Sequence, residues 1–546
     1  MKKIVVYYLL FLIFFTLSSC QIKNPSSDNE KKEYSLLVNG EDYICHSDEY
    51  DSKLWYVNNL DKMPLPDPHV YEENGTYYIV GTSGFYITCY STTDFNTYKN
   101  EGRIYDPRLY NGWENSYQAI FAPELYCFDG VYYLYYSAMD DNHVRRNSVV
   151  YSENVLGPYK PIVNEEVDGL NNPLFLDKNI NNPVLDSSVF LDDDGELYMY
   201  YSVGNLEGQH VVGVKLINPY TADFDTYKEL VKPGYLDSNF TSKPLVWEEY
   251  REVDQIAEAP CMIKSNGKYY LTYSVNGCWN KYYNVCYAVS DSPLGNFVKP
   301  YEEGKTWTNL LMGYPGGKDS ESLIYKQWNG FASGTGHHCF FKIGNQMMIG
   351  YHAHKNRNWN SDHIGTERFF AIDYVYFDET GVPFCNGPTW SIEPLPPAIS
   401  GYQNIAENAG LVYRNVEHAE YVNDNYIEKY YNLVEGNGKE VILGSGYSYI
   451  EFIFDKEYII SGLSIYNSSF YDQMINDIEF IEFDNGRILR NPMFNSDKYV
   501  NDELQFIYPC SALTIEFKEV ITSSKVIIFF KTENGAHINE IQIFGK

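Results

Sequence analysis

The feature that most constrains the fold is a hairpin pattern that occurs five times along the chain. Each copy has an apolar alternating run, a turn rich in Asn, Asp and Gly, and a second alternating run. A period of two together with such turns is the signature of a β-hairpin. The copies read HVYEENGTYYIVGTS, ELYCFDGVYYLYYSA, SVFLDDDGELYMYYS, PCMIKSNGKYYLTYS and HCFFKIGNQMMIGYHA. Regular repeats of this kind predict an array of similar structural units.

The spacing of the repeats predicts their arrangement. The turn glycines are 55, 65, 72 and 77 residues apart, at Gly75, Gly130, Gly195, Gly267 and Gly344. Further strand-like pieces such as GFYITCYSTTDF and YNVCYAVSDSPLG lie between the hairpins, without a long amphipathic helix pattern. Four strands per repeat favour radially arranged sheets, so we expect an all-β chain with a five-bladed β-propeller over residues 53–396. A long β-sandwich array is the alternative.

A second unit is expected after the proline-rich stretch SIEPLPPAIS at residues 391–400, which is typical of a linker. Short strand-like runs follow at sandwich-like spacing, so residues 397–546 are predicted to form a β-sandwich of the jelly-roll kind. The ending AHINEIQIFG resembles discoidin-like, galactose-binding sandwiches, which include some carbohydrate-binding modules. That resemblance implies a carbohydrate-binding domain and fixes no ligand.

The N-terminal segment predicts export. MKKIVVYYLLFLIFFTLSSC has two lysines, a short apolar stretch and small residues before a cysteine, as a cleaved signal peptide over residues 1–19 does. Its LSSC ending resembles a bacterial lipobox, in which Cys20 carries a lipid. Residues 20–52 then form a polar tether and N-terminal segment. We therefore expect a lipid-anchored protein of the bacterial envelope, in the periplasm or on the cell surface, whose membrane contact is through that lipid.

Composition excludes several other classes. The chain has 73 acidic and 41 basic residues, a formal charge of -32, and no Lys/Arg block, so nucleic acid is not an expected partner. Its ten cysteines include no CxxC pair, which disfavours zinc ribbons and thioredoxin-type redox sites. No organic cofactor is expected, and the sequence predicts no oligomeric state.

Acidic residues recur at the starts of the hairpins, where a propeller opens onto its central channel. They are Asp67 in DPHV, Glu124 in APEL, Asp186 in LDSSV and Glu258 in EAPC. Cleavage of a glycosidic bond needs one carboxylic acid to protonate the leaving oxygen and one carboxylate to activate water or attack the sugar. The alternative is that acids at strand ends only accept backbone hydrogen bonds.

Longer motifs around these acids resemble a known family. PDPHV, LDSSVFLDDDGELYMYYS and EAPCMIKSNGKYYLTYS, followed by GTGHH and YHAH, are similar to the signatures of glycoside hydrolase family 43, across residues 60–390. Those enzymes are five-bladed propellers that invert the anomeric configuration. The resemblance implies that Asp67 is the general base, Glu258 the general acid and Asp186 the aspartate that tunes and orients the acid. Inversion requires the acid and base carboxyl groups to be about 6.5–9.5 Å apart.

The same resemblance implies three further roles. Phe121 is expected to line the sugar pocket, and Arg368 to contact the sugar and the tuning aspartate. His337 matches a histidine that supports a cation, often calcium, largely through waters, although a histidine beside another histidine is also commonly a packed residue. Glu124 stands in FAPE where the family has Trp-Ala-Pro-Asp, so we interpret it as structural.

Two tryptophans in loop-like surroundings, Trp279 and Trp359, are candidates for an outer sugar subsite. The expected function is hydrolysis of plant-type polysaccharides or oligosaccharides, with α-L-arabinofuranosidase as the leading activity. β-Xylosidase, arabinanase and galactanase are alternatives, because specificity lies in loops rather than in the three acids. A non-catalytic surface glycan-binding protein, and a lyase or phosphorylase, belong to different classes and stay open.

Overall fold

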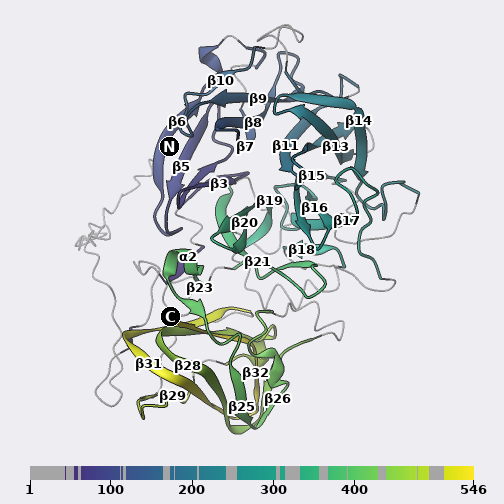
Figure 1. Cartoon of the computed structure of the whole chain (residues 1–546). Helices are drawn as coiled ribbons and strands as arrows, with labels where there is room; N and C mark the ends of the chain where they lie inside the picture. The colour runs from purple at the N-terminus through teal and green to yellow at the C-terminus, as the bar shows by residue number, and fades with distance from the viewer. Residues whose placement is uncertain are drawn as a thin grey trace, which may run out of the picture.

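The computed structural model gives the chain a propeller and a sandwich, both built almost wholly of strands (Figure 1). It describes residues 43–44, 54–58, 63–110, 112–114, 119–163, 173–177, 179–205, 208–241, 255–302, 308–313, 332–355, 367–389, 391–427, 438–475, 478–490 and 510–546. The predicted signal peptide, Cys20, nearly all of the predicted tether, and Trp359 lie outside these residues. Among the described residues, no helix is long and apolar enough to cross a membrane.

Five four-stranded antiparallel sheets make up the propeller, and each uses four consecutive strands. Blades one to three contain β3 (His69–Glu73), β4 (Thr76–Val80), β5 (Ile87–Thr92), β6 (Lys99–Tyr105); β7 (Phe121–Phe128), β8 (Val131–Met139), β9 (Arg145–Ser152), β10 (Lys160–Pro161); β11 (Val184–Leu191), β12 (Leu197–Asn205), β13 (Gly208–Asn218), β14 (Thr221–Val231). Blades four and five contain β15 (Ala257–Ser265), β16 (Lys268–Val275), β17 (Asn284–Ser290), β18 (Leu310–Met312); β19 (Ala332–Ile343), β20 (Gln346–Lys355), β21 (Phe369–Phe377), β22 (Pro383–Cys385). The predicted five-bladed fold is confirmed.

The turn glycines explain why each repeat forms a hairpin. Gly75 joins β3 to β4 with φ 77°, and Asn74 before it has φ 54°. Positive φ at both central residues gives the turn whose twist matches that of two antiparallel strands. The other four turn glycines also have positive φ, between 62° and 86°. Glycine adopts this conformation without steric cost, so these turns fix the register of all five blades.

A bulge near the start of each innermost strand is the second repeated feature. At this point of each blade one residue that is not glycine has positive φ: Asp67, Ala122, Asp186, Ala259 and His337. In blades two to five the pairing of the first two strands shifts register at this point. A bulge leaves one residue out of the ladder and turns the strand. Its backbone N–H therefore needs an acceptor outside its own blade.

A side chain of the preceding blade supplies that acceptor in all five blades, and together these contacts form a ring around the channel. In four of the contacts the acceptor lies at an equivalent position, in the second strand or two residues after it. The bonds run from Ala122 N–H to Thr82 Oγ1 (2.9 Å), Asp186 N–H to Ser137 Oγ (3.0 Å), His337 N–H to Ser274 Oγ (2.8 Å) and Asp67 N–H to His352 Nδ1 (3.2 Å). The last bond joins blade five to blade one and closes the ring.

The third contact of the ring differs from the others. Ala259 donates its N–H to Asp186 Oδ2 at 3.1 Å. Ser202 occupies the position equivalent to Ser137, and its buried hydroxyl has no hydrogen-bond partner among the described residues. A carboxylate thus replaces the hydroxyl as acceptor at this contact.

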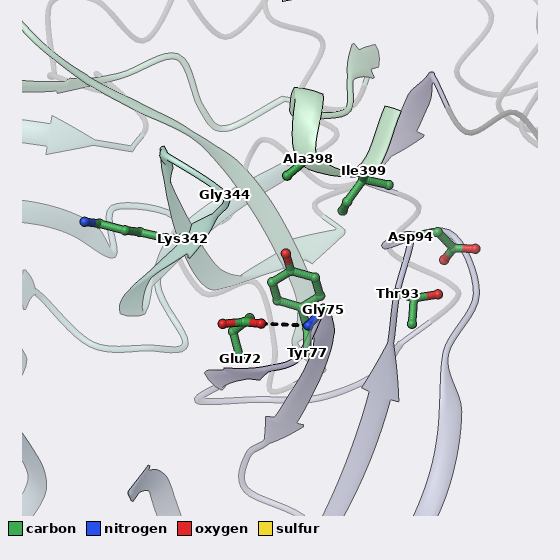
Figure 2. Close-up of a pocket in the computed structure, with 9 residues that line it drawn as sticks. All are labelled: Glu72, Gly75, Tyr77, Thr93, Asp94, Lys342, Gly344, Ala398 and Ile399. Carbon is green, nitrogen blue, oxygen red and sulfur yellow. Dashed lines mark hydrogen bonds between the residues drawn. The ribbon is translucent and has the colours of Figure 1, made fainter. Parts of the chain in front are cut away.

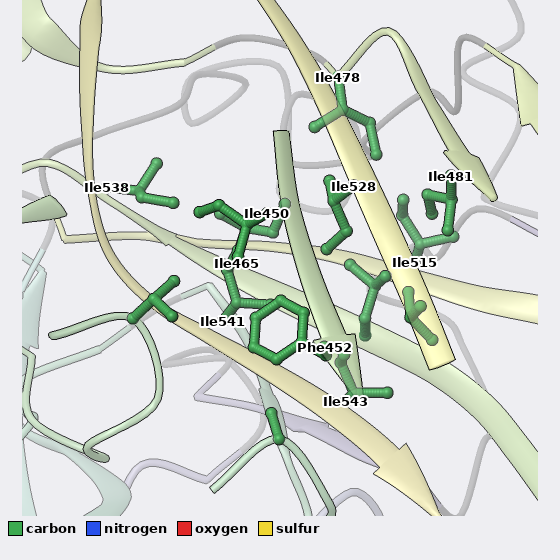
Figure 3. Close-up of a cluster of buried hydrophobic side chains, with 14 of the residues drawn as sticks. Ile450, Phe452, Ile465, Ile478, Ile481, Ile515, Ile528, Ile538, Ile541 and Ile543 are labelled. Atoms are coloured by element: carbon green, nitrogen blue, oxygen red, sulfur yellow. The ribbon is translucent and has the colours of Figure 1, made fainter. Parts of the chain in front are cut away.

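The C-terminal strands form a sandwich, as predicted, whose two layers share strands long enough to bend from one to the other. They are β24 (Gln403–Asn404), β25 (Gly410–Arg414), β26 (Val416–Glu417), β27 (Val441–Leu443), β28 (Gly446–Asn467), β29 (Phe480–Phe483), β30 (Ile488–Arg490), β31 (Ala512–Thr532) and β32 (Ala536–Gly545), with β1 (Tyr43–Ile44) paired to β31. Isoleucine is the commonest residue of the core between the layers, and Figure 3 shows Ile450, Ile465 and Ile528 within it. β-Branched side chains suit such a core, because they pack well on pleated strands.

A short connection joins the two units. β2 (Trp55–Val57) pairs with β23 (Ile392–Pro394), and the single-turn helix α2 (Pro397–Ser400) leads into the sandwich (Figure 1). Trp55 is buried, packs edge-to-face on Phe544 with ring centroids 5.1 Å apart, and donates its Nε1–H to Glu516 at 3.1 Å. One side chain from before the first blade therefore contacts two strands of the sandwich.

We expect Trp55→Ala to destabilise the contact between the units by about 3–5 kcal/mol, because a buried indole is replaced by a cavity. Thermal unfolding of the full chain should then show a sandwich transition separated from, and below, that of the propeller. Leu109→Ala, at a side chain that is 75% exposed, is the control and should leave the melting curve unchanged. A single transition at the wild-type temperature in the Trp55 variant would contradict this role.

Candidate active site

The bulges bring four predicted site residues to one mouth of the channel. His337 Nδ1 lies 3.4 Å from Asp67 Oδ1 and 4.0 Å from Asp186 Oδ2. Asp186 is also close enough to Glu258 and Asp67 for both to affect its titration. Asp67, Asp186 and Glu258 come from blades one, three and four, so only closure of the propeller places them together.

Asp67 is surrounded by donors and cations. Thr82 donates its hydroxyl to Oδ2 at 2.6 Å, and the Arg368 guanidinium donates to Oδ1. Burial alone would raise the pKa of this carboxyl group. The charge of Arg368 outweighs burial and holds the pKa of Asp67 well below its ordinary value of 3.8. Asp67 is therefore ionised across the neutral range.

Asp186 lies in the opposite electrostatic environment. It is buried, and its Oδ2 accepts the backbone N–H of Ala259. Burial raises the pKa of Asp186 well above its ordinary value, and the carboxylates of Glu258 and Asp67 raise it further. Arg145 opposes this rise.

Glu258 is half-buried and held by two donors. Gln209 donates its Nε2–H to Oε2 at 2.7 Å, and Tyr283 donates its hydroxyl to Oε1 at 2.8 Å. Burial raises the pKa of Glu258, while these two hydrogen bonds lower it and Asp67 raises it again, with a net upward shift. Asp186 and Glu258 thus each retain a proton more readily than a free acid does.

These environments give the site two chemical functions at once. Asp67 is a carboxylate able to accept a proton, and the Asp186–Glu258 pair holds a proton that can be donated. Carboxyl groups with pKa values pushed apart are the arrangement that general acid–base catalysis requires. The individual roles of the three acids stay predictions.

Arg368 shows one difference from expectation. The resemblance implied contact with the tuning aspartate Asp186, but the Arg368 guanidinium pairs with Asp67. Arg368 directly precedes β21 in blade five, which is next to blade one across the closure of the propeller, and this places it against the start of β3. Its charge therefore acts most directly on the predicted base.

The predicted aromatic residues differ in their position. Phe121 starts β7 and is half-buried, and the Arg145 guanidinium lies 4.6 Å from its ring centroid. Because Arg145 also acts on Asp186 and Glu258, Phe121 borders the acidic cluster. Trp279 is 38% exposed, and its neighbour Cys278 is close enough to Glu258 and Arg368 for both to shift the pKa of its thiol. No direct contact joins Trp279 to the three acids among the described residues.

Sequence reasoning missed five residues that position the acids: Thr82, Arg145, Gln209, Tyr283 and His352. Arg145, Gln209 and Tyr283 lie at equivalent positions, at or directly before the start of the third strand in blades two, three and four, but their residue types differ and the sequence pattern does not mark them. Thr82 and His352 could have been found, since they align with the serine that ends YYLYYS, LYMYYS and YLTYS in the other copies.

Glu124 is buried in the channel and hydrogen-bonded by the hydroxyl of Tyr126. Burial raises the pKa of Glu124 to about 8. Tyr126 also lies against His69, with ring centroids 4.9 Å apart, and accepts the N–H of Val189. Glu124 therefore belongs to a packed polar layer, in keeping with a structural interpretation.

The described residues do not form a direct metal site. No group of three or more His, Cys, Asp or Glu side chains within them is arranged to hold a metal ion. His337 Nδ1 faces Asp67, and its backbone N–H is bound by Ser274. A cation expected beside His337 would thus need water as most of its ligands, and no chemical step is assigned to one.

A pocket lies away from the acids. It has a volume of about 690 Å³ and is lined by Glu72, Tyr77, Asp94, Lys342 and residues of α2 (Figure 2). Gly75 and Gly344, the hairpin turns of blades one and five, border it, so it lies at the opposite end of β3 from Asp67. Glu72 binds the N–H of Gly75, and the pocket shows no convergence of buried charged groups.

Comparison with known proteins places this site in a family context. The model of glycosyl hydrolases family 43 matches residues 57–383, which include the three acids and all of the five blades except the last two residues of β22. The chain is 26% identical over 253 residues to the β-D-galactofuranosidase xynD of Aspergillus niger, covering 46% of this chain and 57% of that protein. It is 30% identical over 188 residues to a β-xylosidase of Xylanibacter ruminicola, covering 31% and 52%.

The chain spans about half the length of these curated relatives. Among solved structures, a thermostable family-43 glycoside hydrolase is similar, with 24% identity and a TM-score of 0.49, covering 62% of this chain and 99% of that one.

We expect Arg368→Gln to cost about 3–5 kcal/mol of folding stability near neutral pH, because it leaves the buried Asp67 carboxylate without its cation. In the wild type, the low pKa of Asp67 contributes stability above the pKa of the unfolded chain, and this is lost as pH falls. The deficit of the variant should therefore shrink in acid. Urea unfolding at neutral and acidic pH measures it.

Arg103→Gln is the control, since Arg103 pairs with Asp106 but is 47% exposed, and should cost no more than about 1 kcal/mol. An Arg368 deficit of the same size at both pH values would show that packing, rather than the charge of Asp67, is responsible.

Proposed function

Since the chain belongs to family 43 of the glycosyl hydrolases, we propose that it hydrolyses O-glycosidic bonds of a polysaccharide or oligosaccharide with inversion of configuration. The observation that carries the proposal is that carboxyl groups at one mouth of the channel have pKa values shifted in opposite directions. The pKa of Asp67 is held low by Arg368, and the pKa values of Asp186 and Glu258 are raised by burial. An ionised base and a protonated acid then coexist near neutral pH.

In the proposed mechanism, Asp67 removes a proton from a water molecule as that water attacks the anomeric carbon. Glu258 donates its proton to the glycosidic oxygen as the bond breaks, so the leaving sugar departs as a neutral alcohol. Asp186 keeps a proton within the pair and fixes the bulge at Ala259 next to Glu258. Thr82 and Arg368 hold the two oxygens of Asp67, which orients the base toward the channel.

The leading activity within this class is α-L-arabinofuranosidase. The relatives are named for galactofuranose, xylose and arabinose substrates, which supports a furanose or pentose sugar in the central subsite. β-Xylosidase, arabinanase, galactanase and β-D-galactofuranosidase are the alternatives. Phe121 with Arg145 across its ring, and exposed Trp279, are the proposed sugar contacts.

Three accessory properties belong to the same proposal. A lipid on Cys20 anchors the protein in the envelope, which the mass of the exported N-terminal peptide checks. The C-terminal sandwich binds carbohydrate. A cation, calcium in the first instance, lies near His337 and is held through water, so removal by a chelator should reduce activity reversibly.

We expect Asp67→Asn and Glu258→Gln each to lower kcat by at least about 1000-fold, since each removes a proton-transfer group of the reaction. The assay uses aryl arabinofuranosides, xylosides and galactofuranosides together with arabinan and xylan, and NMR identifies the first anomer released. Inversion is the expected outcome. The Glu258 variant should recover activity on aryl glycosides whose leaving group needs no proton, whereas the Asp67 variant should not.

Asp129→Asn is the matched control, because asparagine suits the hairpin turn in which Asp129 has φ 51°. Retention of configuration, an unsaturated product, or full activity of the Asp67 variant would each contradict the proposal. Binding of glycans without turnover by the wild type would favour the non-catalytic alternative.

The pH dependence of kcat/KM should be bell-shaped. The apparent pKa of the acidic limb reports Asp67 and should lie below the ordinary value of 3.8. The apparent pKa of the alkaline limb reports Asp186 and Glu258 and should lie above the ordinary value of 4.5. Tyr283→Phe removes a hydrogen bond that lowers the pKa of Glu258, so the alkaline limb should move upward while the acidic limb stays. Tyr413→Phe, in the sandwich, is the control and should move neither.

A further inference from the structure

One blade differs from the other four at the equivalent position near the end of the second strand. Four blades have a hydroxyl residue there, in the second strand or two residues after it: Thr82, Ser137, Ser202 and Ser274. In blade five the residue is His352, on β20. It is also the member that accepts the N–H of the proposed base, at 3.2 Å. The departure from the repeat therefore coincides with the contact to Asp67.

His352 is enclosed on all sides. Its side chain has no exposed area, and its Nδ1 lies 3.2 Å from the Asp67 nitrogen and 3.3 Å from Asp67 Oδ1. Its ring is parallel to that of Tyr283, with centroids 5.4 Å apart and planes at 5°, and is perpendicular to that of His354. Tyr283 in turn donates to Glu258. The His352 imidazole thus contacts both Asp67, the proposed base, and Tyr283, which holds the proposed acid.

The charge state of His352 follows from its neighbours. Asp67, Arg368, His337, His354 and Tyr283 are the titratable or charged groups around it. Burial and Arg368 keep the pKa of His352 well below its ordinary value, so the ring is neutral. A neutral ring that accepts the Asp67 N–H at Nδ1 carries its proton on Nε2, and Nε2 has no hydrogen-bond partner among the described residues.

This arrangement separates two tasks at Asp67. The carboxylate already receives donors from Thr82 and Arg368, whereas the backbone N–H needs an acceptor in the only direction that the left-handed conformation allows. An imidazole whose Nδ1 is unprotonated accepts that N–H without adding a further proton donor to the carboxylate. A serine hydroxyl would be smaller and would leave a void against Tyr283.

We propose that His352 is a positioning residue for the base: its neutral ring, through Nδ1, holds the Asp67 backbone in the orientation that points the carboxylate at the attacking water. The inference rests on the proposed function, in which Asp67 is the base. It assigns to His352 no proton transfer and no contact with the sugar.

The test compares two amide variants that differ in reach. In His352→Asn the side-chain oxygen can occupy the place of Nδ1, whereas in His352→Gln the amide extends to the place of Nε2 and cannot accept the Asp67 N–H. We expect the Gln variant to lose about 100-fold in kcat with KM nearly unchanged, because a small displacement of a reacting group has this effect. The Asn variant should stay within about fivefold of wild type.

Two readouts distinguish positioning from loss of structure. The loss in the Gln variant should be equal on aryl glycosides with good and poor leaving groups, because the base and not the acid is disturbed. Circular dichroism and melting temperature show whether each variant folds. Ser202→Ala, at the equivalent position of blade three, is the control and should keep wild-type kinetics, because its hydroxyl binds no partner in the described part of the chain.

The Asp67→Asn variant, measured alongside, separates the possible failures. If Asp67→Asn is inactive but His352→Gln has wild-type kcat, the inference about His352 is wrong and the proposed function stands. Equal losses in the Asn and Gln variants, or a loss confined to poor leaving groups, would also overturn it. Full activity of Asp67→Asn would remove the proposed function itself.

Discussion

Closure of the propeller depends on backbone N–H groups that the blades cannot satisfy by themselves. Each innermost strand begins with a bulge residue in the left-handed region, a conformation that costs about 1–3 kcal/mol for a residue other than glycine. The strain persists because the exposed N–H is bound by the neighbouring blade. The same bonds that join the blades therefore aim the bulge side chains into the channel.

The pKa values of the carboxyl groups in this ring differ because the residues around each of them differ. At Asp67 a guanidinium and a hydroxyl donate to the carboxyl group, and both favour the carboxylate. At Asp186 burial and the carboxylates of Glu258 and Asp67 favour the protonated form, and they outweigh Arg145 and the backbone donor Ala259. Two aspartates in the same backbone conformation, φ 55° and 56°, thus titrate in opposite directions. The repeated bulges give the two aspartates the same backbone geometry, and the residues that differ between blades determine how each carboxyl group titrates.

Much of the fold was predictable because it rests on local signals. The hairpin turns at Gly75 and its four equivalents, and the alternation on either side, fix blade number and strand order without knowledge of distant contacts. Three acids were predictable as a group because they recur at one place in the repeat. The pairing of Arg368 with Asp67 rather than Asp186 was not, since it depends on which blades become neighbours at the closure.

By itself, the sequence determined a five-bladed propeller, a following sandwich, and the set of acids at one mouth of the channel. These features follow from the turn residues and the two-residue hydrophobic alternation, which are local properties of each repeat. The tertiary structure decided which acid is ionised and which keeps a proton. That outcome depends on Arg368, Arg145, Tyr283 and His352, which lie far from the acids they act on along the chain. Electrostatic interaction falls with distance in space, and distance in space is set only when the ring closes.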